Sequence, residues 1–352
     1  MGFLLLAILC TSSIALMFKV SETRGMNRYA LTTANYVTAC LVSGTLLLLL
    51  GIPGLGGDVA VGWSDLVDEL AHGPRQETSI DEAGTLLWAL CVGAAAGALF
   101  FLGFLYYQLG VREHGAGLAG ATIKLGVIVP MALSLMVWQE WPSPWEWGGI
   151  LLALAALALV NIPILLGRTP REEPLVTPPP HSSGPPPVPP PPATAAATTT
   201  QRVPLGRYTL VLLFLFGGMA EFSNKVFETY GLLGVERVVD QLRGSLTFLF
   251  VTFFVAFCFS LAWTWKKRMP VRRRDLLLGV AVGVPNLFSS TFLILSLDTV
   301  PAAAAFPAFG AGSILLINLV GVLYFKERLG RREWFAIGLT LMAIALLGLG
   351  QR

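Results

Sequence analysis

The chain has 352 residues, of which 55% are hydrophobic and only 13% are charged, and its mean hydropathy is +0.70. No water-soluble core buries so much apolar surface at so low a charge density, which excludes an ordinary soluble globular protein. The net charge of +3 is too small to indicate a nucleic-acid partner.

Apolar runs of about 20 residues, each long enough to cross a bilayer, follow one another along the chain. Ten such runs predict an all-α polytopic membrane protein with ten transmembrane helices. They cover approximately residues 2–23, 29–50, 84–107, 115–138, 147–166, 208–230, 242–265, 275–297, 301–325 and 333–349.

The first run carries no basic start and no cleavage site, which indicates a retained helix rather than a secretory signal. All four cysteines, Cys10, Cys40, Cys91 and Cys258, fall within apolar runs. This placement indicates buried packing and neither disulfides nor a metal site.

Two segments lie outside the apolar runs. Residues 168–207 contain three runs of proline followed by Ala and Thr, a composition typical of an extended linker. The predicted organisation is therefore a five-helix unit at 1–167, the linker at 168–207 and a second unit at 208–352. The acidic loop after Leu50 is long enough for a short surface helix.

The two units are related by sequence. The motif Lys19-Val-Ser-Glu22-Thr recurs as Lys225-Val-Phe-Glu228-Thr at an offset of 206. Glu140 corresponds to Glu327, and Glu146-Trp147 recurs as Glu333-Trp334, both at an offset of 187. Because five is odd, the second copy enters the bilayer upside down relative to the first. Inverted repeats are typical of transporters that bind substrate near the membrane midplane between the repeats.

Basic residues are distributed unevenly between the two sides. When successive loops are assigned alternately to the two sides of the membrane, 17 of the 24 Lys and Arg residues fall on one side and four on the other. The remaining three, Lys19, Lys124 and Lys225, lie within spans. The positive-inside rule then places the linker in the cytoplasm and both termini outside.

The turn Phe325-Lys-Glu-Arg-Leu329, the following Glu333-Trp-Phe-Ala-Ile-Gly338 and the entry Val300-Pro-Ala-Ala-Ala-Ala-Phe-Pro307 resemble the EamA-like branch of the drug/metabolite transporter superfamily. The resemblance covers both five-helix units. It implies secondary transport of sugars, amino acids, nucleotide-linked metabolites or drugs, coupled to protons or to exchange, in a bacterial inner membrane. Ten-helix members usually keep both termini in the cytoplasm, opposite to the orientation that the charges favour.

Two charged residues lie deep within spans and are the leading candidates for a central cavity. Lys124 lies about ten residues into the fourth span and Glu221 about midway along the sixth, and a charge at that depth requires a partner or water. They are expected either to pair or to leave Glu221 as a protonatable carrier. The alternative is a salt bridge that only fixes helix register.

The resemblance adds a comparison for each residue. Glu221 resembles the membrane-embedded glutamate of small multidrug resistance proteins, and Lys124 resembles one of two anion-binding lysines in sugar-phosphate translocators. Their repeat counterparts, Ala15 and Ala311, are uncharged, so symmetry is broken.

Uncharged polar residues within spans are expected either to line the same cavity or to form interhelical hydrogen bonds. Pro285 and Pro307 are expected to disturb their helices and free a carbonyl.

The Lys and Glu residues that are spaced at i and i+3 near span ends are expected to act either as gates or as interfacial anchors. The cavity candidates are Asn35, Asn224, Asn286, Ser289 and Asn318, the gate candidates are Lys19, Glu22, Lys225 and Glu228, and Trp138, Trp141, Trp145 and Trp147 are expected to form an interfacial belt.

No catalytic constellation, nucleotide-binding motif or cofactor site is visible, so neither an enzyme nor a cofactor is expected. The sequence favours a secondary transporter of a small metabolite or drug-like solute that works by alternating access, as a monomer or homodimer in the lipid bilayer and with protons as one candidate for the coupling ion. The alternatives are a membrane scaffold or sensor that recruits partners through the proline-rich linker, and a flippase for a lipid-linked sugar.

Overall fold

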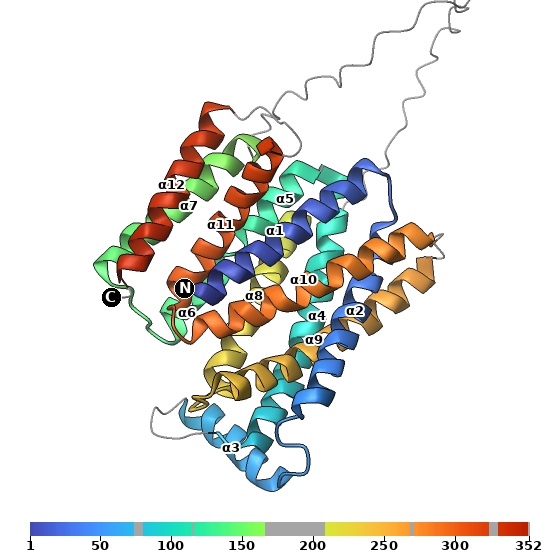
Figure 1. The fold of residues 1–352 in the computed structure, drawn as a ribbon, viewed down its shortest axis with the longest axis vertical. Coiled ribbons are helices and arrows are strands. Elements are labelled where there is room, and N and C mark those ends of the chain that lie inside the picture. Colours follow the sequence, from blue (N-terminus) through green and yellow to red (C-terminus); the bar gives the residue numbers. More distant parts are fainter. Residues whose placement is uncertain (74–79, 115, 166–207, 268–270, 324–329, 351–352) are drawn as a thin grey trace, which may run out of the picture.

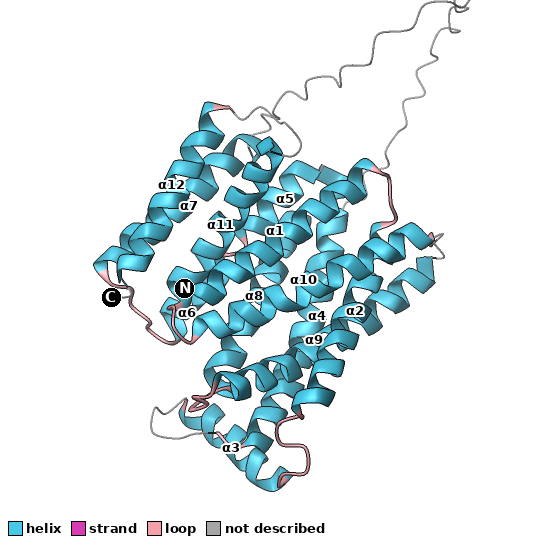
Figure 2. Cartoon of the chain, in the orientation of Figure 1, coloured by secondary structure: helices cyan, strands magenta, loops and turns pink. Residues whose placement is uncertain are grey.

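The computed structural model describes residues 1–73, 80–114, 116–165, 208–267, 271–323 and 330–350. These residues form helices and connecting loops without strands (Figure 2). The helices in Figure 1 are α1 (Gly2–Thr23), α2 (Arg28–Leu50), α3 (Val59–His72), α4 (Glu82–His114), α5 (Ala116–Leu125), α6 (Ile128–Val137), α7 (Pro144–Leu165), α8 (Thr209–Gly231), α9 (Val238–Lys267), α10 (Arg273–Leu297), α11 (Ala302–Leu323) and α12 (Arg331–Gly350).

The predicted class, an all-α polytopic membrane protein, is confirmed. Within the described part of the chain, nine helical stretches are long and apolar enough to span a membrane, and Gly2–Phe18 forms a shorter apolar helix.

Local sequence signals determine where several helices begin and end. Asn27 caps α2 by accepting from the backbone N–H groups of Tyr29 and Ala30, and Gly51, at φ 86°, ends it. The predicted surface helix in the acidic loop is α3.

The fourth span differs from its prediction, because it is broken rather than continuous. Its two parts, α5 and α6, are separated by Gly126 and Val127. Pro130 has no N–H with which to bond the Gly126 carbonyl, and that oxygen instead accepts from Val129 N at 2.9 Å in a tighter turn. Pro285 and Pro307 lie inside uninterrupted helices, so the disturbance expected at Pro307 is absent.

The helices pack in a pattern that treats the two halves alike. Helix α1 packs against α10 and α11, while α8 packs against α4, α5 and α6. Helix α2 packs against α9 and α10, α9 also packs against α4, and α7 packs against α12 (Figure 1). In each half the first helix packs against helices of the other half, as two equivalent five-helix units would do. The boundaries of these units and their inverted relation stay predictions.

One end of the bundle, called the α3 end below, gathers α3, the ends of α2 and α8, and the starts of α4 and α9 (Figure 1). Contacts between distant segments define it. Arg243 donates to the Gly51 carbonyl at 3.2 Å, and Ile80 N donates to the Leu233 carbonyl at 3.1 Å.

Two apolar clusters form the interior. One is centred on α11 and includes Phe306, which is completely buried, and the other lies among α2, α4, α8 and α9 around Phe253. The expectation for cysteine is right for Cys40, which is buried, and wrong for Cys91 and Cys258, which are exposed on the outer surface.

Candidate functional site

The break in the fourth span lies directly against α8. A methyl group added to Gly218 would lie 2.6 Å from the Gly126 carbonyl oxygen and 2.5 Å from the Val129 Cβ, so only glycine permits this approach. Non-helical backbone at membrane depth is tolerated where protein buries it or a watery cavity borders it. The break therefore marks the level at which α5, α6 and α8 meet, and Lys124 and Glu221 lie within three residues of it along their helices.

Lys124 is held at the end of α5, two residues before the break, where its charge complements the C-terminal end of the helix dipole. Its Nζ donates to Ser313 Oγ of α11 at 3.4 Å. Ser313 is buried, and its carbonyl accepts from Ser12 Oγ of α1 at 3.4 Å. Ser313 therefore links Lys124 of α5 to α11 and, through its carbonyl, to α1.

Glu221 lies on α8, where Asn224 Nδ2 donates to its Oε2 at 3.3 Å. Asn224 is completely buried, and its Oδ1 has no hydrogen-bond partner among the described residues. Glu221 and Lys124 attract each other electrostatically, yet they are not within the 4.0 Å of an ion pair. Both side chains are half-buried. The direct pairing considered from the sequence is therefore not formed, and the two opposite charges stay available to a third group.

The other polar residues suggested by the sequence lie elsewhere. Asn286 Nδ2 of α10 donates to Asn35 Oδ1 of α2 at 3.1 Å, and Ser289 Oγ of α10 donates to the Ala7 carbonyl of α1 at 3.2 Å. These contacts join neighbouring helices, which is the alternative that the sequence left open. The structure does not bring these residues into contact with Lys124 or Glu221.

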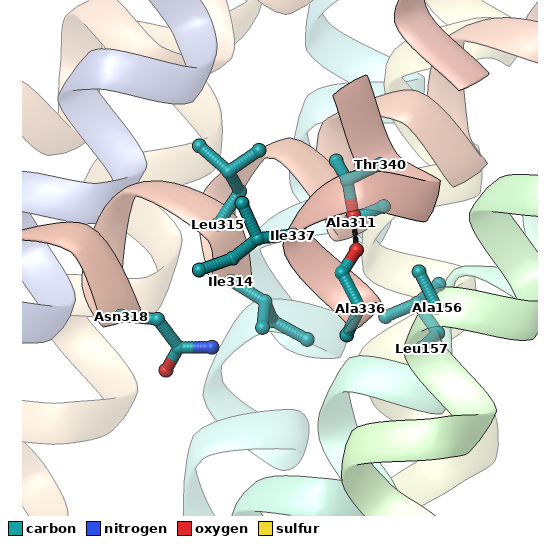
Figure 3. Close-up of a pocket in the computed structure, with 9 residues that line it drawn as sticks. All are labelled: Ala156, Leu157, Ala311, Ile314, Leu315, Asn318, Ala336, Ile337 and Thr340. Carbon is teal, nitrogen blue, oxygen red and sulfur yellow. Dashed lines mark hydrogen bonds between the residues drawn. The ribbon is translucent and has the colours of Figure 1, made fainter. Parts of the chain in front are cut away.

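Asn318 borders a separate small cavity between α7, α11 and α12, shown in Figure 3. Its volume of about 10 Å³ is close to the least that accommodates one water molecule. Ile314, Ile337 and Leu157 line it, and the nearby Thr340 hydroxyl donates to the Ala336 carbonyl of its own helix at 2.9 Å. A cavity this small and apolar suits helix packing better than a transported solute.

A cluster of three charged residues, Lys225, Glu228 and Glu140, lies where the end of α8 meets the loop after α6, and is called the Lys225 triad below. Lys225 Nζ lies 2.8 Å from Glu228 Oε2 on the same helix and 2.8 Å from Glu140 Oε1 in the loop after α6. The Lys225 side chain is 6% exposed, so both bonds are largely screened from water. Glu140 Oε2 also accepts from Ala302 N, the first residue of α11, at 3.2 Å. Glu140 thereby joins α8 to α11.

The loop after α6 is shaped to direct Glu140 inward. Gln139 has φ 53°, the one non-glycine residue with positive φ in the described part of the chain, and this left-handed turn follows the end of α6. The Trp138 ring lies 5.7 Å below Lys225 Nζ and packs against Phe222 and Tyr230 at 5.4 and 6.2 Å. Trp138 and Trp147 are half-buried and Trp141 and Trp145 are exposed, so the interfacial belt stays a prediction.

The remaining gate candidates, Lys19 and Glu22, lie near the end of α1, and their side chains fall outside the described part of the structure. Sequence reasoning paired Lys225 with Glu228 but assigned no contact to Glu140 or Ser313, because both reach their partners across more than 80 residues. Among the described residues, no group of three metal-binding side chains comes together.

Comparisons with known proteins agree with this architecture. The family model described as "EamA-like transporter family" matches residues 229–349. A solved structure that is 15% identical superposes over 99% of this chain and 95% of its own with a TM-score of 0.59, which shows a shared fold.

Two curated relatives match parts of the chain. The "Probable 4-amino-4-deoxy-L-arabinose-phosphoundecaprenol flippase subunit ArnE" of Hamiltonella defensa is 31% identical over 88 residues, which cover 25% of this chain and 76% of that protein. An uncharacterized protein of Haemophilus influenzae is 27% identical over 126 residues, or 35% of this chain, and the match spans 43% of that protein's length. The chain therefore belongs to the EamA-like transporter family, within the drug/metabolite transporter superfamily.

Proposed function

We propose that the protein is a secondary transporter that binds a small polar metabolite or drug-like solute between α5, α8 and α11. The observation that carries this proposal is the helix break at Gly126, beside which Lys124 and Glu221 carry opposite charges that attract each other but form no ion pair. Charged groups are costly at this depth, and those that are retained in transporters usually face substrate or ion pathways.

The chemistry of the site favours a ligand with both donor and acceptor groups. Lys124 offers an ammonium group to an anionic or acceptor atom, while Glu221 offers a carboxylate to a donor or a proton. The unpartnered Oδ1 of Asn224 adds an acceptor one turn from Glu221. A zwitterionic or hydroxylated solute satisfies these groups together, and exchange of a proton on Glu221 for that solute would couple transport to pH.

The Lys225 triad supplies a closure at one end, as alternating access requires. Two segments, α8 of the second predicted repeat and the loop after α6 of the first, meet there through one ammonium group, and the Trp138 ring packs against that group. In this proposal the triad is intact when the site is closed toward the α3 end, and it opens when the loop after α6 separates from both α8 and α11. The predicted counterpart at the other end, Lys19 with Glu22, stays a prediction.

Thermal stabilisation of the purified protein by a panel of solutes tests the binding site. Sugars, amino acids, nucleotides and cationic drugs are compared at pH 5.5 and 8, because a bound ligand raises stability in proportion to its excess over its dissociation constant. A shift that Lys124→Met and Glu221→Gln both abolish supports the site. Solute uptake into proteoliposomes that is unchanged in well-folded Glu221→Gln would remove the proton-carrier role, and stabilisation that survives both substitutions would remove the site.

A flippase is the second candidate, because the ArnE relative carries that name and an apolar groove opens between α4 and α8. A fluorescent lipid-linked sugar that changes leaflet only in proteoliposomes containing the protein would favour it over solute transport.

A membrane scaffold is tested through the proline-rich linker, which lies outside the described residues. Replacing its prolines by a flexible sequence of equal length should leave solute transport intact, whereas a scaffold would lose its partners.

A further inference from the structure

The largest feature that the transport site does not use is an apolar groove on the outer surface of the bundle. Its volume is about 410 Å³, and its walls are formed by α4 and α8 with α3 across one end. Ser223 is the one hydroxyl-bearing side chain of its lining. Its lining includes Trp63, Trp88, Ala95, Leu99, Met219 and Phe222.

The groove runs along α4 rather than across it. On α4 it extends from Trp88 to Leu99, a distance of about 16 Å at 1.5 Å per residue, or half the thickness of a hydrocarbon core. Its deep end is reached at Met219, which follows the Gly218 contact with the helix break. Both walls are candidate membrane spans, so the groove opens sideways into the hydrocarbon of a bilayer.

Helix α3 closes the shallow end and lies with its apolar side toward the groove. Leu66 is buried against the bundle, Glu69 accepts a hydrogen bond from the Trp88 indole, and Trp63 is 56% exposed. Asp65 and Asp68 lie on the other side of the helix. An amphipathic helix so placed, with an exposed tryptophan beside its apolar face, is suited to the interface between lipid and water.

The surroundings of this end are acidic. Residues 51–83 contain seven Asp and Glu residues and a single Lys or Arg residue, Arg75, which lies outside the described part of the chain. Arg243, which approaches from α9, is already bonded to Asp240 and lies 3.5 Å from Glu82. A head group that carries an ammonium is therefore attracted here, whereas a purely anionic head group is repelled.

We infer that this groove binds one hydrocarbon chain of a membrane phospholipid whose ethanolamine head group lies at α3. The chain fills the space from Trp63 to Met219 and packs against Phe222, whose ring meets Trp138 beneath the Lys225 triad at 5.4 Å. This inference holds whichever solute is transported, because it rests on α3, α4 and the outer face of α8.

Native mass spectrometry of protein released from mixed phosphatidylethanolamine and phosphatidylglycerol membranes tests the proposal. The natural chain should retain one phosphatidylethanolamine per protein, at least ten times more often than phosphatidylglycerol. Ala95→Trp places an indole in the groove and should reduce retention at least ten-fold. Ala94→Trp is the matched control, because Ala94 is also exposed on α4 but lies outside the groove lining, and it should retain the lipid.

A second measurement does not depend on the folding of a variant with a filled groove. A fluorophore on Ala94→Cys, exposed on α4 beside the groove but outside its lining, is compared with one on Cys258, exposed on α9, each as the one remaining cysteine. Quenching by chain-spin-labelled phosphatidylethanolamine should saturate at low mole fraction for Ala94→Cys and rise in proportion to lipid for Cys258. Equal quenching curves, or equal lipid retention by Ala95→Trp and Ala94→Trp, would overturn the chain site. Preference for phosphatidylglycerol would overturn the head-group assignment.

Discussion

Removing the Glu140 carboxylate tests the closure most directly. In Glu140→Gln, Lys225 keeps Glu228 but loses the carboxylate that ties α8 to the loop after α6. Breaking one partner of a fully buried ion pair costs about 3 to 5 kcal/mol. The Glu140 side chain is 26% exposed and the glutamine amide can still cap α11, so we expect a coupling energy between Glu140 and Lys225 of about 2 kcal/mol.

A double-mutant cycle of Glu140→Gln and Lys225→Met, followed by equilibrium unfolding in mixed micelles, measures this coupling. The matched control is the Arg243–Glu82 pair, at 3.5 Å and with Glu82 61% exposed, for which about 0.5 kcal/mol is expected. Function is followed through a cysteine introduced at the buried Ser313. An impermeant thiol reagent applied from the α3 end should label it faster in Glu140→Gln. Coupling below about 0.5 kcal/mol for the triad, or unchanged labelling, would refute the closure.

Two further predictions concern packing and pH. Gly218→Ala forces a methyl group against the Gly126 carbonyl and should destabilise the protein by about 1 to 3 kcal/mol, whereas Gly120→Ala, with no atom within 4 Å, should be neutral or stabilising in thermal unfolding. Burial raises the pKa of Glu69 from 4.5 to about 7, with neighbouring carboxylates adding to the rise and Trp88 opposing it. Folding then favours the protonated form, so the packing of α3 should weaken as pH rises from about 4.5 through 7. Hydrogen exchange of α3 should quicken over this pH range in the natural chain, and this pH dependence should be absent in Glu69→Gln.

The spans were predictable because their signal is local. A run of about 20 apolar residues suffices to indicate each helix, and Asn27 and Gly51 mark helix ends by their own chemistry. The break at Gly126 was not anticipated, since glycine and valine do not interrupt an apolar run. The four-residue spacing from Gly126 to Pro130 was the available signal, because that proline removes the hydrogen bond to that carbonyl.

Side-chain partners were predicted only where they lie on one helix. Lys225 and Glu228 are three residues apart, so their pairing follows from helix geometry. The bonds of Lys225 to Glu140 and of Lys124 to Ser313 depend on how helices from the two halves dock. Polarity alone also failed to separate Asn286, which joins two helices through Asn35, from residues at the helix break.

The two bonds of Glu140 impose a rule on how the α3 end can open. One Glu140 oxygen binds the ammonium group of α8 and the other accepts from the first N–H of α11. If one helix moves and Glu140 follows it, the bond from Glu140 to the helix that stays behind is strained. The carboxylate is released only when both partners leave or when its own loop swings away. In a partly opened arrangement the ion pairs of the Lys225 triad are already weakened, but water does not yet hydrate the separated charges. Such arrangements are therefore less stable than either the closed or the open state. Opening should therefore be a single concerted step between two discrete states, and not a gradual separation of the helices.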